Sequence, residues 1–295
     1  MTVRLAVIGP GRVGSAMARR WDEGGQPIEG FIGRSSASAR AAVDFCGAGR
    51  VLDWADLAEV AIVFVAVGDA ELAGLVKDLA ADSGVALAGS LWIHASGCYG
   101  PEVFAPLVRA HGVRAGALHP LCPIPDASLG YRVLDGAPAS IDAESDADRE
   151  ELARLARCAG MVATPLNAGL DRTRYHAACA LAANGATALF GLANRLLEQG
   201  MEADDARRVT GALVAGALEL CEAKGAAAAL SGPVARGDRD VVTAHLAALS
   251  GDTEAHSAYV TLSRSALGLA VKRGLLDRQQ QLALIEALGV RRVDG

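Results

Sequence analysis

The first half of the chain alternates short apolar runs with amphipathic helical stretches. The run AIVFVAV at 61–67 is apolar throughout, as in a strand buried on both faces of a parallel sheet. The pattern predicts strands at 4–8, 28–33, 61–67, 91–95 and 114–118, and helices at 13–23, 37–46, 70–81 and 101–111. This β-α-β-α order with short connections predicts an α/β fold with a doubly wound parallel sheet.

The pattern changes after Pro120. A proline-rich loop, LCPIPD, leads to two further predicted strands at 139–142 and 163–166, which flank one helix. From Asp171, a predicted helix N-cap, the chain is alanine-rich and helical. One long helix is expected to run to Gly200, followed by helices at 202–224, 238–249, 253–273 and 277–288. We therefore expect a Rossmann domain at residues 1–167 and an all-α C-terminal domain at residues 168–295.

Composition narrows the class of protein. The 295 residues are 52% hydrophobic and 21% charged, which is typical of a globular protein. The net charge is -6 and no long basic stretch occurs, which argues against nucleic acid or an anionic membrane as partner. The six cysteines form no C-x-x-C pair, so neither a disulfide framework nor a metal site is expected.

Neither a membrane span nor a signal peptide is predicted. The most apolar stretch, 177–193, is interrupted by Asn184 and falls short of about 20 residues, so a buried helix is the interpretation. A strand is predicted within a few residues of Met1, which leaves no room for a signal peptide. The expected location is the cytoplasm.

A glycine-rich motif follows the first predicted strand and precedes the first predicted helix. The motif is G-x-G-x-x-G, in the context required of a dinucleotide-binding turn. Its glycines allow a tight turn, close approach of the backbone to a pyrophosphate, and close packing of helix on strand. The pyrophosphate would bind at the helix N-terminus. The residues expected to bind it are Gly9, Pro10, Gly11, Arg12, Val13 and Gly14.

The end of the second predicted strand indicates which dinucleotide binds. Enzymes that use NAD place a carboxylate here, about twenty residues after the glycines, to bind the ribose 2′-hydroxyl. This chain has Arg34, Ser35 and Ser36 and no carboxylate nearby in sequence. A guanidinium and two hydroxyls bind a 2′-phosphate, so the cofactor is predicted to be NADP(H).

Two further groups are expected at the carboxyl edge of the sheet. Val67, Gly68 and Asp69 follow the strand at 61–67, where ligands of such folds bind, and are expected to contact the cofactor's ribose. Asp69 also suits the N-cap of the next helix. His94 and His119 end two later strands at the same edge, and each is either functional or a hydrogen-bonded structural histidine.

The long predicted helix carries polar residues among alanines. Arg172, His176 and Asn184 recur at intervals of four and eight residues, which places them along one side. Buried polar groups need partners, and either a substrate or another helix could supply them. Further along, Arg236 could bind a substrate carboxylate or be an ordinary loop residue, and Asp238 is predicted to cap a helix.

The chain resembles bacterial Rossmann-like oxidoreductases with a C-terminal helical domain of unknown function. These are relatives of pyrroline-5-carboxylate reductase, ketopantoate reductase and deazaflavin-dependent NADP reductases, within the 6-phosphogluconate dehydrogenase superfamily. The matching segments are Gly9–Gly14, His94-x-Ser96-Gly97, His119-Pro120, Tyr175-His176 through Asn184, and Ser231-Gly-Pro233-Val-Ala-Arg236-Gly-Asp238.

The resemblance implies an NADP-dependent oxidoreductase, dehydrogenase or reductase, that dimerises through its helices. It implies that Ser96 binds cofactor and that His94, Pro120, Pro233 and Arg236 contact a small-molecule substrate. Ketopantoate reductases use a helix lysine for proton transfer, but Lys77, Lys224 and Lys272 all lie off the long helix. His119 or His176 would have to replace it, with Asn184 orienting the substrate.

The sequence is compatible with three functions. The leading hypothesis is reduction by NADPH of a small carbonyl or imine substrate, a ketopantoate-like keto acid in particular, with a pyrroline-type imine as the alternative. A non-catalytic NADPH-binding sensor would keep the glycine motif and Arg34 but need no productive cleft. An oxidative NAD-dependent alcohol dehydrogenase is disfavoured by Arg34.

Overall fold

The structure is a computed structural model that describes residues 3–82, 87–167 and 169–289. It divides the chain into two compact units, Met1–Asn184 and Gly185–Gly295. Each unit is described by itself.

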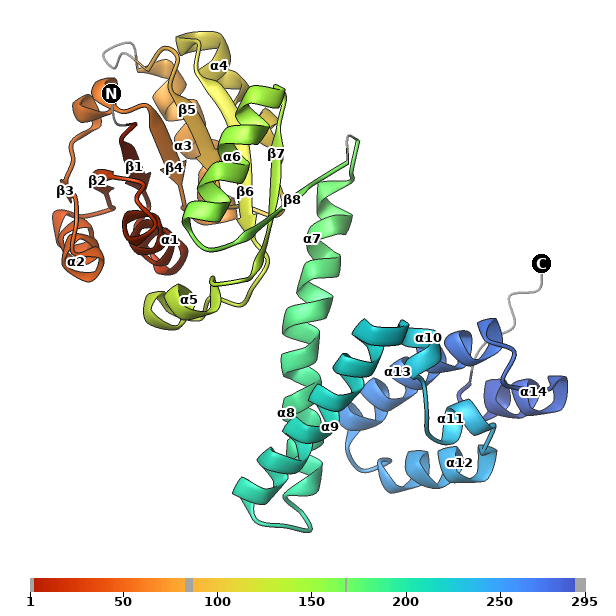
Figure 1. The fold of residues 1–295 in the computed structure, drawn as a ribbon. Coiled ribbons are helices and arrows are strands. Elements are labelled where there is room, and N and C mark those ends of the chain that lie inside the picture. The colour runs from red at the N-terminus through yellow and green to blue at the C-terminus, as the bar shows by residue number, and fades with distance from the viewer. Residues whose placement is uncertain (1–2, 83–86, 168, 290–295) are drawn as a thin grey trace. The chain divides into compact units, whose positions relative to one another are not determined.

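An eight-stranded sheet forms the centre of the first unit (Figure 1). The strands are β1 Leu5–Ile8, β2 Ile28–Ile32, β3 Arg50–Val51, β4 Ile62–Val65, β5 Leu91–His94, β6 Arg114–Pro120, β7 Pro138–Ala143 and β8 Val162–Pro165. Their order is β3-β2-β1-β4-β5-β6-β7-β8, and neighbouring strands are parallel except β6 and β7, which pair antiparallel. The predicted doubly wound sheet is confirmed.

Helices cover both faces of this sheet. They are α1 Arg12–Glu23, α2 Ser36–Cys46, α3 Asp69–Ala81, α4 Ala105–His111, α5 Ala127–Val133 and α6 Asp146–Cys158, with 3-10 turns at Trp54–Glu59 and Pro101–Phe104. Leu5 and Val7 of β1 pack with α1, α2 and α6, whereas Ala6 and Ile8 pack with α3 and α4. This alternation explains why β1 and β4 are apolar at every position.

One helix of the first unit was missed by the pattern. The proline-rich loop after β6 leads into α5, whose N-cap Asp126 accepts hydrogen bonds from the amides of Ser128 and Leu129. Gly130 of α5 lies so close to α1 that an added Cβ would be 3.2 Å from that of Ala16. A short helix after prolines has too few turns to show a 3.6-residue period, so the pattern indicated only a loop.

The long alanine-rich helix begins as predicted, with Asp171 accepting a hydrogen bond from the Arg174 amide. It consists of α7 Arg172–Ala180, a π-helical turn Leu181–Gly185, and α8 Ala186–Leu197. By length and composition it could span a membrane, and no part of its most apolar window is buried within this chain. The prediction of a buried helix is therefore wrong for the single chain.

The unit boundary falls inside this helix, at the π-helical turn, and not near Asn167 as the composition predicted. The physical reason is that the first turns of α7 are bonded to the sheet. Arg172 forms an ion pair with Asp142 of β7, and the Tyr175 hydroxyl lies 2.8 Å from the Ser140 hydroxyl of the same strand.

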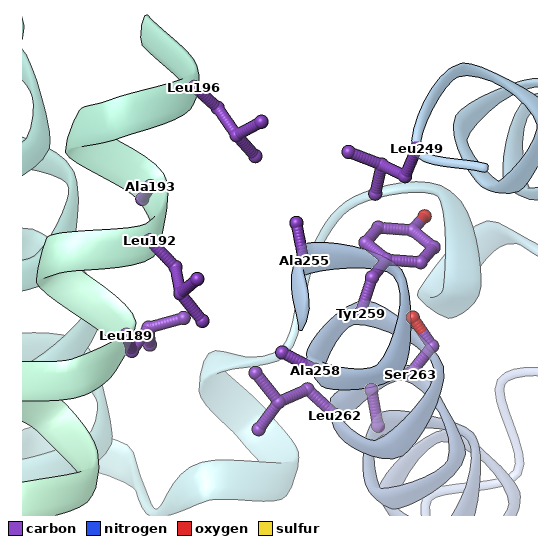
Figure 2. Close-up of a pocket in the computed structure, with 11 residues that line it drawn as sticks. Leu189, Leu192, Ala193, Leu196, Leu249, Ala255, Ala258, Tyr259, Leu262 and Ser263 are labelled. Atoms are coloured by element: carbon purple, nitrogen blue, oxygen red, sulfur yellow. The ribbon is translucent and has the colours of Figure 1, made fainter. Parts of the chain in front are cut away.

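The second unit is entirely helical in its described part. Besides α8 it contains α9 Ala203–Lys224, α10 Ala226–Ala229, α11 Pro233–Arg236, α12 Arg239–Ala248, α13 Thr253–Lys272 and α14 Arg278–Ala287. A small core forms around Val242, Leu267 and Leu284. Between α8 and α13 an apolar groove of about 330 Å³ is lined by leucines, with Tyr259 and Ser263 as its polar members (Figure 2).

Candidate functional site

The glycine motif forms the turn from β1 into α1 and borders a cavity of about 430 Å³. Gly9 has φ +80°, and a Cβ there would lie 2.8 Å from Cγ1 of Val67. A Cβ on Gly14 would lie 2.6 Å from the Gly9 carbonyl oxygen. Gly11 caps α1 without a side-chain hydrogen bond, so the first amides of α1 remain available for a phosphate. The turn therefore has the geometry that pyrophosphate binding requires.

The same cavity brings together segments that are distant in sequence. Its lining residues are Gly9, Pro10, Gly11, Arg12, Val13, Arg34, Ser38, Ala66, Val67, Gly68 and Glu71. Most of the residues predicted to bind cofactor are among them. Ser35 is instead the N-cap of α2, accepting a hydrogen bond from the Ser38 amide. Ser38 lines the cavity. The sequence did not identify Ser38 because Ser35 and Ser36 are the first hydroxyl-bearing residues after Arg34.

Arg34 has a carboxylate neighbour that the sequence did not reveal. Its guanidinium is 93% exposed and lies 3.9 Å from Glu71 of α3. No carboxylate is close to Arg34 in the sequence, but Glu71 is close to it in the folded protein. The prediction that no carboxylate lies nearby is therefore wrong. Glu71 and a 2′-phosphate would compete for the same guanidinium. Gly68, and not Asp69, is the N-cap of α3.

A second group of side chains lies where β6 and β7 meet α7. The Nδ1 atom of His119, near the end of β6, is 3.3 Å from the Tyr175 hydroxyl. That hydroxyl in turn hydrogen-bonds the Ser140 hydroxyl at 2.8 Å. The His119 and His176 rings are 5.8 Å apart between centroids. Two of the three predicted histidines thus come together. His119 also contacts Tyr175, to which the sequence assigned no role.

The loop after β5 holds the two rings in place. A Cβ added to Gly97 would lie 2.4 Å from Nδ1 of His176 and 2.7 Å from Cε1 of His119. Any larger residue at position 97 would therefore displace both histidines. Burial, and then the neighbouring His176, lower the pKa of His119 to about 4. At neutral pH this imidazole is uncharged, so it cannot donate a proton as an imidazolium ion.

The structure gives His94 a structural role. It is fully buried, its Nε2 lies 3.0 Å from the Gly100 carbonyl oxygen, and its Nδ1 accepts a hydrogen bond from the Ser96 amide. Ser96 is also buried, and its hydroxyl accepts a hydrogen bond from the Cys98 amide. Both side chains therefore stabilise the loop after β5.

Burial of His94 predicts a pH-dependent stability. Desolvation lowers its pKa from 6.5 to about 4. Between pH 6.5 and about pH 4, the unfolded chain binds a proton at His94 that the folded chain does not bind. The free energy of unfolding therefore falls as the pH is lowered from 6.5 to 4. The loss is on the order of 3 kcal/mol for this residue. Urea unfolding of the native chain and His94→Gln at several pH values should show a shallower slope in the variant. Equal slopes would contradict the assignment.

The remaining predicted residues have other partners, are exposed, or belong to the second unit. Arg172 is paired with Asp142, so it is not free to bind substrate in this state. The π-helical turn breaks the α-helical spacing that placed Asn184 in line with Arg172 and His176, and Asn184 is exposed there. Pro233 and Arg236 belong to the second unit, where Arg236 pairs with Asp238 at 2.8 Å.

Comparisons with known proteins agree with this architecture. Residues 1–120 match the model of a Rossmann-like domain, and residues 137–266 match a domain of unknown function, DUF2520. The chain combines these two domains. No curated protein matches it. The Rossmann-like domain contains the cavity at the glycine turn. The DUF2520 segment begins just before β7 and contains Tyr175 and His176.

Solved structures share the fold across almost the whole chain. A Bacteroides fragilis protein provisionally described as an NADP oxidoreductase is 22% identical, with a TM-score of 0.70 over 90% of this chain and 98% of its own. An imine reductase from a Pseudomonas species is 18% identical, with a TM-score of 0.62 over 98% and 100%. A pyrroline-5-carboxylate reductase from Coxiella burnetii is 18% identical, with a TM-score of 0.56 over 98% and 97%.

Proposed function

We propose that the protein is an NADP(H)-dependent reductase of a small carbonyl or imine substrate. The proposal rests on the cavity at the glycine turn, where the free backbone amides at the start of α1 and the Arg34 side chain lie together. The pyridine nucleotide supplies the hydride, so the protein must position the substrate and deliver one proton. The similar structures support this assignment, because two are described as an NADP oxidoreductase and an imine reductase.

His119 is the proposed proton donor, with a neutral ring throughout. Ser140, Tyr175 and His119 form a hydrogen-bonded chain in that order, which allows a proton relay. The His119 Nε2 proton would pass to the substrate oxygen or nitrogen while Nδ1 takes the proton of the Tyr175 hydroxyl. The Tyr175 hydroxyl donates to Ser140 in the resting state, so it would turn to His119 for this step and regain a proton from solvent after each turnover. Burial raises the pKa of Tyr175, which favours this return of the proton. The relay explains how a histidine with a pKa of about 4 can act at neutral pH.

The substrate is proposed to be a cyclic imine or a small 2-oxo acid such as a ketopantoate-like compound. A specific observation favours the imine, since one similar structure is an imine reductase and another a pyrroline-5-carboxylate reductase. The test is the oxidation of NADPH, followed by absorbance, against a panel of cyclic imines and 2-oxo acids. Turnover with at least one member is expected. NADPH that binds but is never oxidised would favour a sensor instead.

The protein is further proposed to be a cytoplasmic homodimer formed through its helices. The helix Arg172–Leu197 is apolar, and its most apolar window has no buried residue within one chain. The leucine-lined groove between α8 and α13 adds apolar surface to the second unit (Figure 2). Surface of this kind is typically covered by a partner.

Light scattering on the purified protein measures the assembly directly. We expect a molar mass of twice the 30.1 kDa of one chain, in buffer without detergent. Replacing the exposed Leu189 of the groove by glutamate should shift the mass toward the monomer, because a charge would then face apolar surface. A monomeric native protein, or one that requires detergent, would contradict the proposal.

A further inference from the structure

Three potential metal ligands from distant parts of the first unit converge beside the histidine pair. Asp69 is the first residue of α3, Cys98 lies in the loop after β5, and His176 is on α7. One ligand atom from each lies within 4.8 Å of the other two. The sequence predicts no metal site because these residues have no recognisable spacing along the chain.

His176 is the member that most clearly lacks a partner. Its Nδ1 atom is buried, and in the described part of the chain it has no hydrogen-bond partner. The same atom lies against the backbone at Gly97, where a Cβ would be 2.4 Å away. A buried polar nitrogen left unpaired costs about 1–3 kcal/mol, so a partner that restores this interaction is expected.

The three donors match the preferences of one class of metal. A carboxylate oxygen, a thiolate sulfur and an imidazole nitrogen together are typical ligands of Zn²⁺, and three protein ligands leave a fourth tetrahedral position open. Bonds of about 2.0–2.3 Å to the metal separate such ligands by roughly 3.3–3.8 Å. Small side-chain rotations would bring the present atoms to that separation.

We propose that Asp69, Cys98 and His176 bind a divalent cation of the zinc class with one open coordination position. Metal binding replaces the thiol proton: the S–H bond breaks, the proton leaves to solvent, and a metal–sulfur bond forms. Affinity for the cation therefore rises with pH.

The proposed ligand His176 lies next to the proposed proton donor, because the rings of His176 and His119 are 5.8 Å apart. A carbonyl oxygen bound at the open coordination position would be polarised by the cation and close to a proton source. This role of the cation rests on the proposed reductase function, whereas the binding site itself does not.

Cobalt(II) titration of the full-length protein, purified with chelator, tests the site directly. We expect one Co²⁺ per chain and a thiolate-to-cobalt charge-transfer band in the near ultraviolet. Cys98→Ser should abolish the band, and His176→Gln should weaken binding by at least about 10-fold. The matched control Cys122→Ser, which alters another half-buried cysteine, should behave as the native protein.

The possible results distinguish a failure of the metal site from a failure of the proposed reductase function. Native protein that takes up no stoichiometric Co²⁺, or a band that persists in Cys98→Ser, overturns the metal site. NADPH binding, measured in parallel by nicotinamide fluorescence, reports on the cofactor cavity independently. Protein that binds NADPH but no Co²⁺ therefore refutes only the metal site, and protein that binds Co²⁺ but no NADPH refutes only the reductase.

Discussion

Replacing Arg34 by alanine is expected to weaken NADPH binding by about 100-fold and to leave NADH binding nearly unchanged. The reason is that only NADPH carries the 2′-phosphate, and the 93% exposed guanidinium borders the cofactor cavity. Titration followed by nicotinamide fluorescence measures both dissociation constants. The control Arg40→Ala removes an exposed arginine of α2 that does not line the cavity.

Glu71→Gln provides the opposite change in the same titration. Its carboxylate is 3.9 Å from Arg34, so removing the charge should strengthen NADPH binding about threefold, with little effect on NADH. The effect should shrink at high salt, because both side chains are exposed. Equal loss of NADPH and NADH affinity in Arg34→Ala would show that Arg34 does not recognise the 2′-phosphate.

Replacing His119 by glutamine is expected to lower kcat by about 100-fold or more, with NADPH affinity retained. Glutamine keeps polar atoms of similar reach but cannot pass a proton from one ring nitrogen to the other. Steady-state kinetics with the best substrate of the imine and 2-oxo acid panel measure the loss. His256→Gln, on α13, is the control that should retain native kcat.

Tyr175→Phe distinguishes a relay from a histidine that acts alone. It removes the hydroxyl 3.3 Å from His119 Nδ1, so kcat should fall while the KM for NADPH is unchanged. The solvent deuterium isotope effect on kcat should rise because proton delivery becomes rate-limiting. A variant with native kcat would remove Tyr175 from the relay, and native kcat in His119→Gln would remove histidine catalysis altogether.

The sequence predicted the sheet and the glycine turn well because both depend on local patterns. A run such as IVFV in β4 is buried on both faces, and the turn needs glycine at position 9 because its φ is +80°. The location of His119 at the end of a strand was predicted for the same reason, since the period of a strand is visible in one segment.

The parts that the sequence could not predict depend on contacts between distant segments. Glu71 reaches Arg34 from α3, and Tyr175 reaches His119 from α7, so neither neighbour is visible in the local pattern. His94 and His119 look alike at two strand ends, and only the carbonyl of Gly100 and the amide of Ser96 identify His94 as structural. Composition predicts that the apolar helix Arg172–Leu197 is buried, but composition alone does not show whether the rest of the chain packs against it.

The proposed hydride transfer is tested most directly with NADPH that carries deuterium at C4 of its nicotinamide. We expect the protein to transfer this deuterium to the carbonyl or imine carbon of a substrate from the panel. The product would then be heavier by one deuterium in mass spectrometry, and the transfer would use one face of the ring only. Retention of the label by NADPH deuterated on either face of the ring, in the presence of every carbonyl and imine tested, would rule out hydride transfer.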